Sequence, residues 1–558
     1  MYVAITRKKY KDTYHEQILL RESYREGKLV KTRTLLNLTN QPRDQVEAIA
    51  AVLKNKKDLT ALSPIQSTGK TIGFSFVLLF LMDSLGILSG IGKSFHAKIA
   101  LMLIVARVVI TGSRLQALKW AKEEDKILDL LLFSKDEKEK LTDKTIYLGL
   151  EYIEENQEKI ENKLFKSYYG SNPPKRVFYD VTSSYVEGEY ENSELVAYGY
   201  NRDGKKGKKQ VVIGLLTDEF GHAISIHTYR GNTNDVKTFS DQLNKLKTRF
   251  NLENIVIVGD GGMIKSDDII KIKEMGYDYI TSIGKPSIKK LIDDKDSQMQ
   301  ISLFDEDLKE FIDGDKRYIL RQNPIRKEEI TKTREQKLQR LQHIINEKTN
   351  YYNAHYKAKS VTMQDKLNKA INDLKLSSFV SVAISYADGK VKCYDSKTHK
   401  EIIKTKPLAT VTIVIDEKAK KEIMQLDGCY VIMTSLIDET KNSKEDIHKA
   451  YKTLIKVENA FKTLKTDFLE IRPLYIKSDK RLKGHIALSM LSYNTALELK
   501  NYVKLAKLDF KSTIRELSIV QTVVNTINKS ISYETIPNVS QNLKNLFNII
   551  GVNLPNKL

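Results

Sequence analysis

Between residues 175 and 285, strand patterns alternate with helical patterns, and this order constrains the fold more than any other feature of the sequence. The predicted strands lie at 176–186, 210–218, 222–229, 254–260 and 277–284. Helical patterns separate the third strand from the fourth and the fourth from the fifth. The fourth strand, NIVIVGD, is almost wholly apolar, as expected of a centre strand that is buried on both faces. The order predicts a mixed α/β sheet flanked by helices.

Two aspartates occupy positions in these strands from which side chains reach a ligand. Asp180 lies inside the first strand, in VFYDVT, and Asp260 closes the fourth, in VIVGDGG. In α/β sheets, side chains at the carboxyl ends of strands line the ligand crevice. The Gly261-Gly262 pair leaves room for a substrate backbone to approach. A strand-end aspartate can also cap a turn, and this alternative stays open for either residue alone.

An amphipathic helix is predicted at 451–465, YKTLIKVENAFKTLK, and one of its charges does not fit the pattern. Leu454, Ile455 and Phe461 recur at the three- and four-residue steps of a buried face. Glu458 lies four residues after Leu454 and three before Phe461. Its carboxylate is therefore predicted to project from the apolar stripe, where an unpaired charge is costly. A role for the negative charge would explain this position.

Three carboxylates brought together suit one kind of chemistry. A two-metal phosphoryl-transfer site needs about three carboxylates that converge on a pair of Mg²⁺ ions roughly 4 Å apart. Mg²⁺ prefers oxygen ligands and keeps several waters, so few protein groups are required. A helix that packs Glu458 against the sheet would bring it to Asp180 and Asp260. We therefore expect these three residues to be both the catalytic residues and the metal ligands.

The same residues lie in motifs that resemble those of the DDE transposases of bacterial insertion sequences. The motifs are VFYDVTS, the segment at 199–239, VIVGDGGM and YKTLIKVENAFKTLK, and together the resemblance covers about 175–500. Four motifs in the family's order are a specific match, although each motif alone is modest.

Within that family, the chain resembles the group with the YREK signature, which places Tyr, Arg, Glu and Lys at fixed spacings. Tyr451, Glu458 and Lys465 fall at the expected spacings. Leu454 occupies the arginine position, a departure that puts a phosphate contact from that turn in doubt.

The resemblance implies an RNase H-like catalytic domain that is interrupted by an insertion before the glutamate helix. It implies an enzyme that binds the terminal inverted repeats of its own element, hydrolyses a phosphodiester to expose a 3′-OH, and joins this hydroxyl to target DNA. Mg²⁺ would be the cofactor, with Mn²⁺ as a substitute, and the DNA-bound protein is expected to be a homodimer. Two alternatives stay open: a metal-dependent RNase H-like DNA nuclease without strand transfer, and an inactive DNA-binding regulator.

Six residues in and after the glutamate helix are candidates for DNA binding. They are Tyr451, Lys465, Arg472, Arg481, Lys483 and His485. The first two lie about one to two helical turns from the glutamate, within reach of phosphates. The other four could line a DNA channel, or could belong to a helix surface with ordinary positive charge. The lysine-rich NRDGKKGKKQ at 201–210 is likewise either a phosphate-binding loop or a solvated turn.

The overall charge favours a polyanionic partner. The 92 Lys and Arg outnumber the 71 Asp and Glu, which gives a formal net charge of +21. Residues 72–92 are long enough to span a bilayer, but Asp83 at their middle would cost about 2.5–3.5 kcal/mol there, so we expect buried helices and no membrane partner. The N-terminus lacks the apolar run of a signal peptide. We expect a cytoplasmic, nucleoid-associated bacterial protein.

Composition and patterns divide the chain into five predicted parts. They are a small strand-rich segment (1–62), a helical domain that is a candidate for DNA binding (63–170), the catalytic domain (171–285 and 427–505), an insertion subdomain (286–426) and a C-terminal helical tail (506–558).

Overall fold

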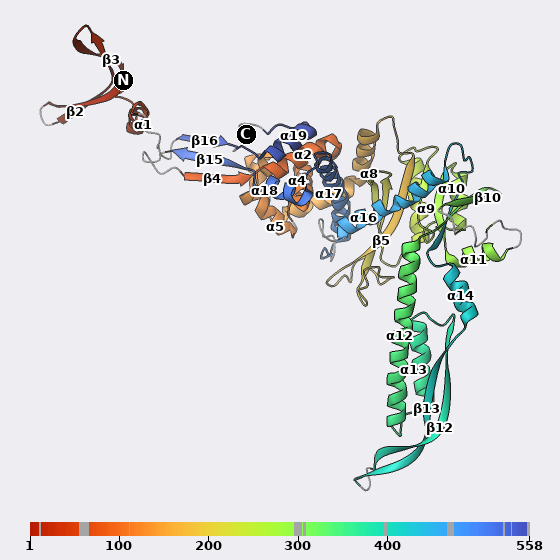
Figure 1. The fold of residues 1–558 in the computed structure, drawn as a ribbon. Helices are drawn as coiled ribbons and strands as arrows, with labels where there is room; N and C mark the ends of the chain where they lie inside the picture. Colours follow the sequence, from red (N-terminus) through yellow and green to blue (C-terminus); the bar gives the residue numbers. More distant parts are fainter. Residues whose placement is uncertain are drawn as a thin grey trace.

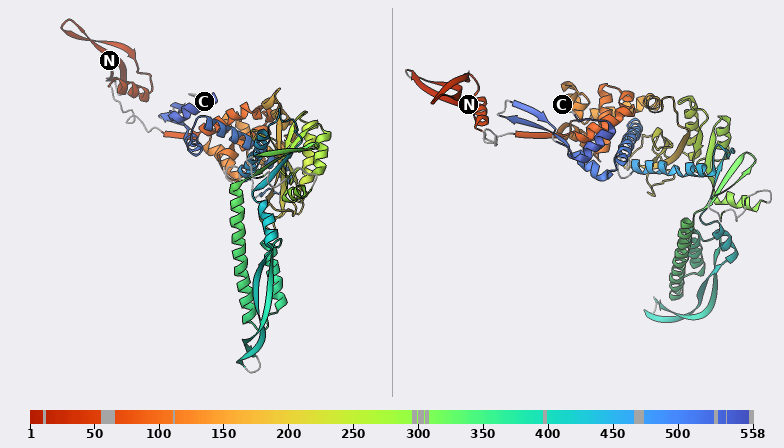
Figure 2. Two further views of the ribbon diagram at one scale, coloured as in Figure 1. Left: turned by 45° about the vertical axis from the view of Figure 1, so that its right-hand side comes forward. Right: turned by 45° about the horizontal axis from the view of Figure 1, so that its top comes forward.

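The computed structural model describes residues 1–10, 13–54, 66–110, 112–294, 299, 304, 308–395, 399–465, 474–527, 531–536 and 538–554. A small N-terminal sheet, a helical body, a large sheet and a long arm follow one another along the molecule (Figure 1). Figure 2 shows from two further directions that the N-terminal sheet lies apart from the body and that the arm projects away from the large sheet.

The large sheet contains eight strands in the described part of the chain. They are β5 (Arg176–Tyr185), β6 (Gln210–Asp218), β7 (Ala223–Arg230), β8 (Val256–Val258), β9 (Asp278–Ile283), β10 (Lys309–Asp313), β11 (Lys316–Gln322) and β14 (Cys429–Thr434). Their order is β10-β11-β14-β9-β8-β5-β6-β7. β5, β8 and β9 are parallel to one another, and the other neighbours are antiparallel. The predicted mixed α/β sheet is confirmed.

The two strands at one end of this sheet come from the region that was predicted to be an insertion. β10 and β11 lie within 286–426; β11 pairs with β14 and β10 pairs with β11, so this region also extends the sheet. The buried Arg317 of β11 holds the edge together: its Nη2 lies 2.5 Å from Glu310 Oε2, and its Nη1 donates hydrogen bonds to the backbone oxygens of Leu436 and Asn442. Short strands with a buried arginine resemble surface segments in sequence, which is why the pattern did not predict them.

The two faces of β5 pack against different helices, because successive side chains of a strand point to opposite sides. Val177 and Tyr179 share a core with α9 (Asp235–Thr248) and α10 (Ser266–Glu274). Phe178 belongs to the core on the other side. That side is covered by α8 (Leu148–Tyr169), α16 (Leu454–Lys465) and α17 (Asp479–Leu505). Asp180 lies two residues after Phe178 and therefore on this second side.

The arm consists of the remaining part of the predicted insertion. Its elements are α12 (Pro324–Ala354), α13 (Ser360–Asp373), the hairpin of β12 (Val380–Asp395) and β13 (Lys400–Ile415), and α14 (Glu417–Gln425). They enclose an apolar core of their own. At the base, Arg334 Nη2 lies 2.5 Å from Asp427 Oδ2, and Lys285 Nζ lies 3.4 Å from Asp427 Oδ1. This buried carboxylate, two residues before β14, ties α12 to the first residue of α11 (Lys285–Asp293).

The helical body packs around α17. Its other elements are α2 (Gly73–Ser84), α3 (Ile87–Ile91), α4 (Phe95–Val109), α5 (Arg114–Lys119), the π-helix Trp120–Glu124, α6 (Ile127–Leu130), α7 (Lys135–Lys140), the 3₁₀ turn Thr145–Tyr147, α18 (Phe510–Ile519) and α19 (Gln541–Ile550). At Gly484 of α17, a Cβ atom would lie 2.0 Å from the backbone oxygen of Leu150 in α8. Glycine therefore permits the close approach of these two helices.

The apolar stretch at 72–92 forms two helices, α2 and α3, that are interrupted at Gly86 with a φ of 75°. Asp83 lies exposed on α2. No single described helix is long and apolar enough to cross a membrane; α4 and the helical run Arg114–Glu124 meet the criterion together only as a pair bent by 105°.

The C-terminal tail differs from the predicted helical tail. Besides α18 and α19 it contains β15 (Gln521–Ile527) and β16 (Ile531–Thr535), and β15 pairs with β4 (Gln66–Thr71). The β-branched residues in QTVVNTI favour a strand. Pairing across more than 450 residues of sequence is not visible in a local pattern.

The N-terminal unit consists of β1 (Tyr2–Tyr10), β2 (Thr13–Glu26), β3 (Leu29–Asn37) and α1 (Arg43–Leu53). The strands form an antiparallel sheet with a small core, as the strand-rich segment predicted.

Candidate active site

Asp180 and Asp260 stand at the same level on neighbouring parallel strands. The register of β5 and β8 pairs Phe178 with Val258, so the residues two positions further along each strand lie side by side. Neighbouring strands are separated by about 4.8 Å. β9 continues this register on the far side of β8 and brings Ser282 to the same level. The carboxyl ends of the three parallel strands therefore present these side chains together.

In each aspartate, backbone N–H groups hold one carboxylate oxygen. Val181 N donates to Asp180 Oδ1 at 2.8 Å, and the N–H groups of Gly262 and Met263 donate to Asp260 Oδ1 at 2.9 Å each. Asp260 thus caps a turn, but with one oxygen only. Within the described residues, no group donates to Oδ2 of either aspartate. Both Oδ2 atoms remain available to a ligand.

Helix α16 covers this side of β5 and carries Glu458. Its buried face is made of Val457, Ala460, Phe461 and Leu464. Glu458 is exposed and Ile455 is 58% exposed, so the prediction that Glu458 projects from the apolar stripe is wrong. The helix begins anew after a break at Thr453, where α15 (Lys444–Lys452) ends, and this break changes which residues face the core. Glu458 lies at the edge of the stripe, where a charge remains solvated.

The electrostatics of Asp180 place all three carboxylates in one neighbourhood. Burial, and then the negative charges of Asp260 and Glu458, raise the pKa of Asp180 from 3.8 to about 7, against an opposing hydrogen bond from Val181. The charge of Arg202 lowers it. The site thus concentrates negative charge around Asp180.

Tyr451 belongs to the same neighbourhood. Burial raises the pKa of its hydroxyl; a hydrogen bond with the Ser282 side chain lowers it, and the charges of Asp260 and Glu458 raise it. Ser282 Oγ also accepts a hydrogen bond from Gly261 N at 3.2 Å. Ser282 therefore connects Tyr451 to the turn that follows Asp260.

Two of these residues were missed in the sequence. The sequence did carry a signal for Ser282, because it ends the fifth predicted strand and the argument used for the aspartates applies to it. Arg202 was noted only as part of a basic loop. Its backbone N–H donates to Ser183 Oγ at 3.0 Å, which fixes the loop to β5 beside the site.

The carboxylates are near one another without forming a closed cluster. In the described part of the chain, no three His, Cys, Asp or Glu side chains lie close enough to hold a single metal ion. No described Lys or Arg lies within 4.0 Å of Glu458. The arrangement offers oxygen ligands from neighbouring strands and the helix that covers them.

Comparison with known families decides the assignment. Residues 171–495, more than half of the 558 residues, match the family profile of the transposase DDE domain. The chain belongs to the DDE transposases. Residues 3–64 of this DDE transposase match the N-terminal domain of the IS1634 family transposases. The narrower placement in the group with the YREK signature stays a prediction.

Other comparisons add little to the family assignment. No curated protein matches the transposase chain. Among solved structures it is similar to the "Mos1 transposase paired-end complex with left transposon end", at 12% identity and with a TM-score of 0.14. The match covers 30% of this chain and 59% of that chain, and at this score it carries no argument.

The cations predicted to contact DNA after the glutamate helix lie on α17 of the transposase, where they face α8. Arg481 Nε donates a hydrogen bond to Glu151 Oε1 at 2.6 Å, and Lys483 Nζ lies 4.0 Å from Glu154 Oε1. These carboxylates offset both charges, so the pairs account for the cations without DNA. Arg472 and the side chain of Lys465 lie outside the described residues.

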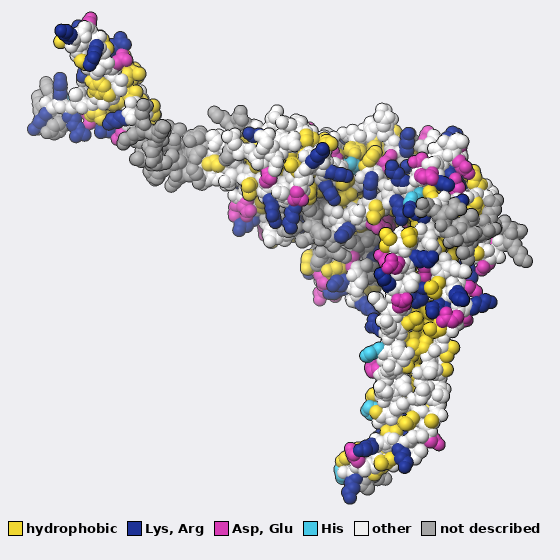
Figure 3. Space-filling model, viewed as in Figure 1, with side chains coloured by type: hydrophobic (Ala, Val, Ile, Leu, Met, Phe, Trp, Pro, Cys, Tyr) yellow, Lys and Arg dark blue, Asp and Glu magenta, His cyan; other side chains and the backbone are white. Residues whose placement is uncertain are grey.

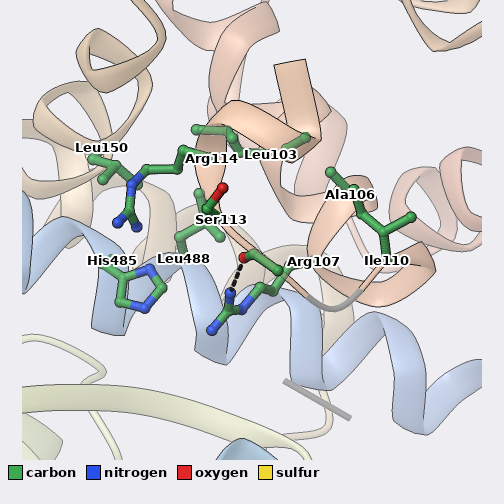
Figure 4. A pocket seen from close by; sticks show the side chains of 11 residues that line it. Leu103, Ala106, Arg107, Ile110, Ser113, Arg114, Leu150, His485 and Leu488 are labelled. Atoms are coloured by element: carbon green, nitrogen blue, oxygen red, sulfur yellow. Dashed lines mark hydrogen bonds between the residues drawn. The ribbon is translucent and has the colours of Figure 1, made fainter. Parts of the chain in front are cut away.

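The prediction that His485 contacts DNA is wrong. The side chain is only 5% exposed and lines a small cavity of ≈ 20 Å³. Arg107 and Arg114 lie beside it in this cavity (Figure 4). Burial, and then the charges of the two arginines, lower the pKa of His485 well below its ordinary range, so the ring is neutral. The segment RLKGHIAL belongs to a helix that is buried nearly all round, which its basic residues conceal.

Proposed function

We propose that this DDE transposase cleaves DNA at the ends of its insertion sequence and joins the exposed 3′-OH to target DNA, with Asp180, Asp260 and Glu458 as catalytic residues. The main support is the position of Asp180 and Asp260 at one level of two parallel strands, with the charge of Glu458 acting on the same site. Three carboxylates from two strands and a covering helix suit phosphoryl transfer.

The donor set fits divalent metal ions, and we propose Mg²⁺, with Mn²⁺ as a substitute. Hard oxygen ligands suit Mg²⁺, and two Oδ2 atoms have no donor among the described residues. Because burial and the neighbouring negative charges raise the pKa of Asp180, a nearby cation would favour its ionised form. Mg²⁺ keeps several waters, so the carboxylates need not all reach one ion. When bound, two ions would supply the positive charge that favours attack of an oxygen on phosphorus.

The chain's own residues would position the DNA. A Cβ atom at Gly261 would lie 2.1 Å from Ser282 O, so this glycine admits the neighbouring strand. The sugar-phosphate backbone would pass beside Asp260, and, through Ser282, Tyr451 stands next to the turn that follows this aspartate. We propose Tyr451 and Lys465 as phosphate contacts. Binding of two element ends is expected to require a homodimer, because each chain presents one site.

The test is cleavage of a labelled duplex that carries the element end, in the presence of Mg²⁺. Asp180→Asn, Asp260→Asn and Glu458→Gln are each expected to reduce the cleavage rate by about 100-fold or more. DNA binding should be largely retained, since affinity comes mainly from Lys and Arg on phosphates. Asp267→Asn, at an exposed aspartate in the first turn of α10, is the matched control and should cleave normally. Near-normal cleavage by any of the three variants would remove that residue from the site.

A further inference from the structure

A groove of ≈ 1100 Å³ lies beside α16. Its walls are the tip of the β6–β7 hairpin, α16, and the C-terminal half of α17 with the turn that follows. The described residues that line it include no aspartate or glutamate. They include five lysines: Lys456, Lys462, Lys500, Lys504 and Lys507.

The groove adjoins the carboxylate site along α16. Lys462 is one helical turn after Glu458, and the helical repeat places the two side chains about 40° apart around the axis. Asn459 and Lys456 line the groove further around the same exposed face. A chain that lay in the groove would therefore pass directly beside Glu458.

The basic residues in the two halves of α17 differ in whether a carboxylate lies beside them. In the N-terminal half, Lys480, Arg481 and Lys483 each lie beside a glutamate of α8. In the groove, Lys500 and Lys504 are exposed, and no described carboxylate lies within 4.0 Å of either. Exposed lysines such as these two, with no described counterion, are expected on a surface that binds a polyanion.

Contacts within the protein fix the wall opposite α17. Tyr493 Oη donates to the backbone oxygen of Gly221 at 3.0 Å, and Lys456 Nζ donates to that of Glu219 at 2.7 Å. These bonds tie the hairpin tip to α17 and α16. Phe220, between the two bonded residues, remains 64% exposed at the rim. An exposed aromatic ring beside lysines is typical of grooves that follow a nucleic-acid strand.

We propose that this groove binds the sugar-phosphate backbone of the DNA strand that leads into the active site. The proposal rests on the proposed function, because it takes DNA as the substrate of the adjoining carboxylates. The groove exceeds the about 300–1,000 Å³ of small-molecule pockets, and five lysines line it among apolar residues. Lys and Arg are also abundant elsewhere on the surface (Figure 3), so the test must separate local contacts from overall charge.

The experiment compares two variants with equal loss of charge. Lys500→Gln/Lys504→Gln removes two groove lysines, and Lys273→Gln/Lys480→Gln removes two lysines that each lie beside a carboxylate outside the groove. Binding of a labelled 30-bp duplex, and of one of its strands alone, is measured by anisotropy across a salt series without metal. Each lost phosphate contact should reduce the slope of log K against log salt by about 0.9 for duplex. We therefore expect the groove variant to lose about 1.8 from the slope and the control to keep the slope of the unmodified protein.

Equal slopes for the groove variant and the unmodified protein would overturn the proposal, and so would an equal loss in the control. Matching melting temperatures show that both variants are folded. Because the titration needs neither metal nor cleavage, its outcome is separate from that of the proposed function. The unmodified protein could fail to cut element ends while the salt slope of the groove variant still falls as expected. That result would contradict the proposed reaction and leave the DNA-binding groove supported.

Discussion

At the scale of single residues, the central feature is a carboxyl group whose ionisation the fold opposes. Asp180 is held beside Asp260 and Glu458 by strand register and by α16, and burial together with these two charges raises its pKa from 3.8 to about 7. Without a cation, the repulsion among these carboxylates only destabilises the site. Divalent cations reduce this repulsion when they bind, so the same grouping of carboxylates favours their binding.

This feature predicts a pH-dependent stability. Since the pKa of Asp180 is raised on folding, its contribution is fully present below about pH 4 and is lost as the pH rises through about 7. Asp180→Asn cannot ionise, so without metal we expect the variant to melt above the unmodified protein at pH 8, with a smaller gap at pH 5. The pKa change corresponds to at most roughly 4 kcal/mol. The measurement is thermal melting in chelator at both pH values.

Added Mg²⁺ extends the same experiment. At pH 8 it should raise the melting temperature of the unmodified protein and have less effect on Asp180→Asn. If the two proteins show the same pH dependence in chelator, the ionisation of Asp180 is not opposed by the fold and the electrostatic account is wrong.

At the scale of elements, α8 and α17 pack closely against each other on one face of the sheet. Gly484 of α17 lies against the backbone of Leu150 in α8, where a Cβ atom would be 2.0 Å from an oxygen. We expect Gly484→Ala to separate the helices and to reduce the free energy of unfolding by about 1–3 kcal/mol. Gly284→Ala is the control, because its Cβ would meet only Pro286 Cδ at 3.6 Å. Denaturant unfolding measures both; equal stabilities would show that the helix contact yields without cost.

The sequence predicted those elements whose burial can be read from the pattern of adjacent residues. The apolar β8 and the alternating β5 were predicted because burial is written into adjacent residues, and Asp180 and Asp260 followed from their places in those strands. Three features escaped because they depend on partners far away in the chain. β15 pairs with β4, β11 buries an arginine against distant backbone oxygens, and α17 conceals a buried face behind basic residues. The predicted orientation of Glu458 was wrong because the helix break at Thr453 leaves no clear signal in the sequence.

At the scale of the whole molecule, the chain has far more structure than a hydrolytic site requires. The arm built on α12 projects from the catalytic sheet, and the N-terminal sheet lies at the opposite end (Figure 1). A nuclease needs only to cut and release DNA, whereas a transposase must retain the cut end beside its target. We interpret the lysine-lined groove, the arm and the N-terminal sheet as candidate surfaces for that retention.

Joining of precut ends tests the central claim most directly, because cutting alone does not distinguish a transposase from a nuclease. Purified protein, Mg²⁺, labelled precut element ends and a plasmid are combined, and the products are separated on a gel. The account predicts that label moves into plasmid-sized product with the unmodified protein and with Asp267→Asn, and that it stays unjoined with Asp260→Asn. Precut ends that are never joined, while the unmodified protein still nicks the same DNA, would contradict the account and identify a nuclease.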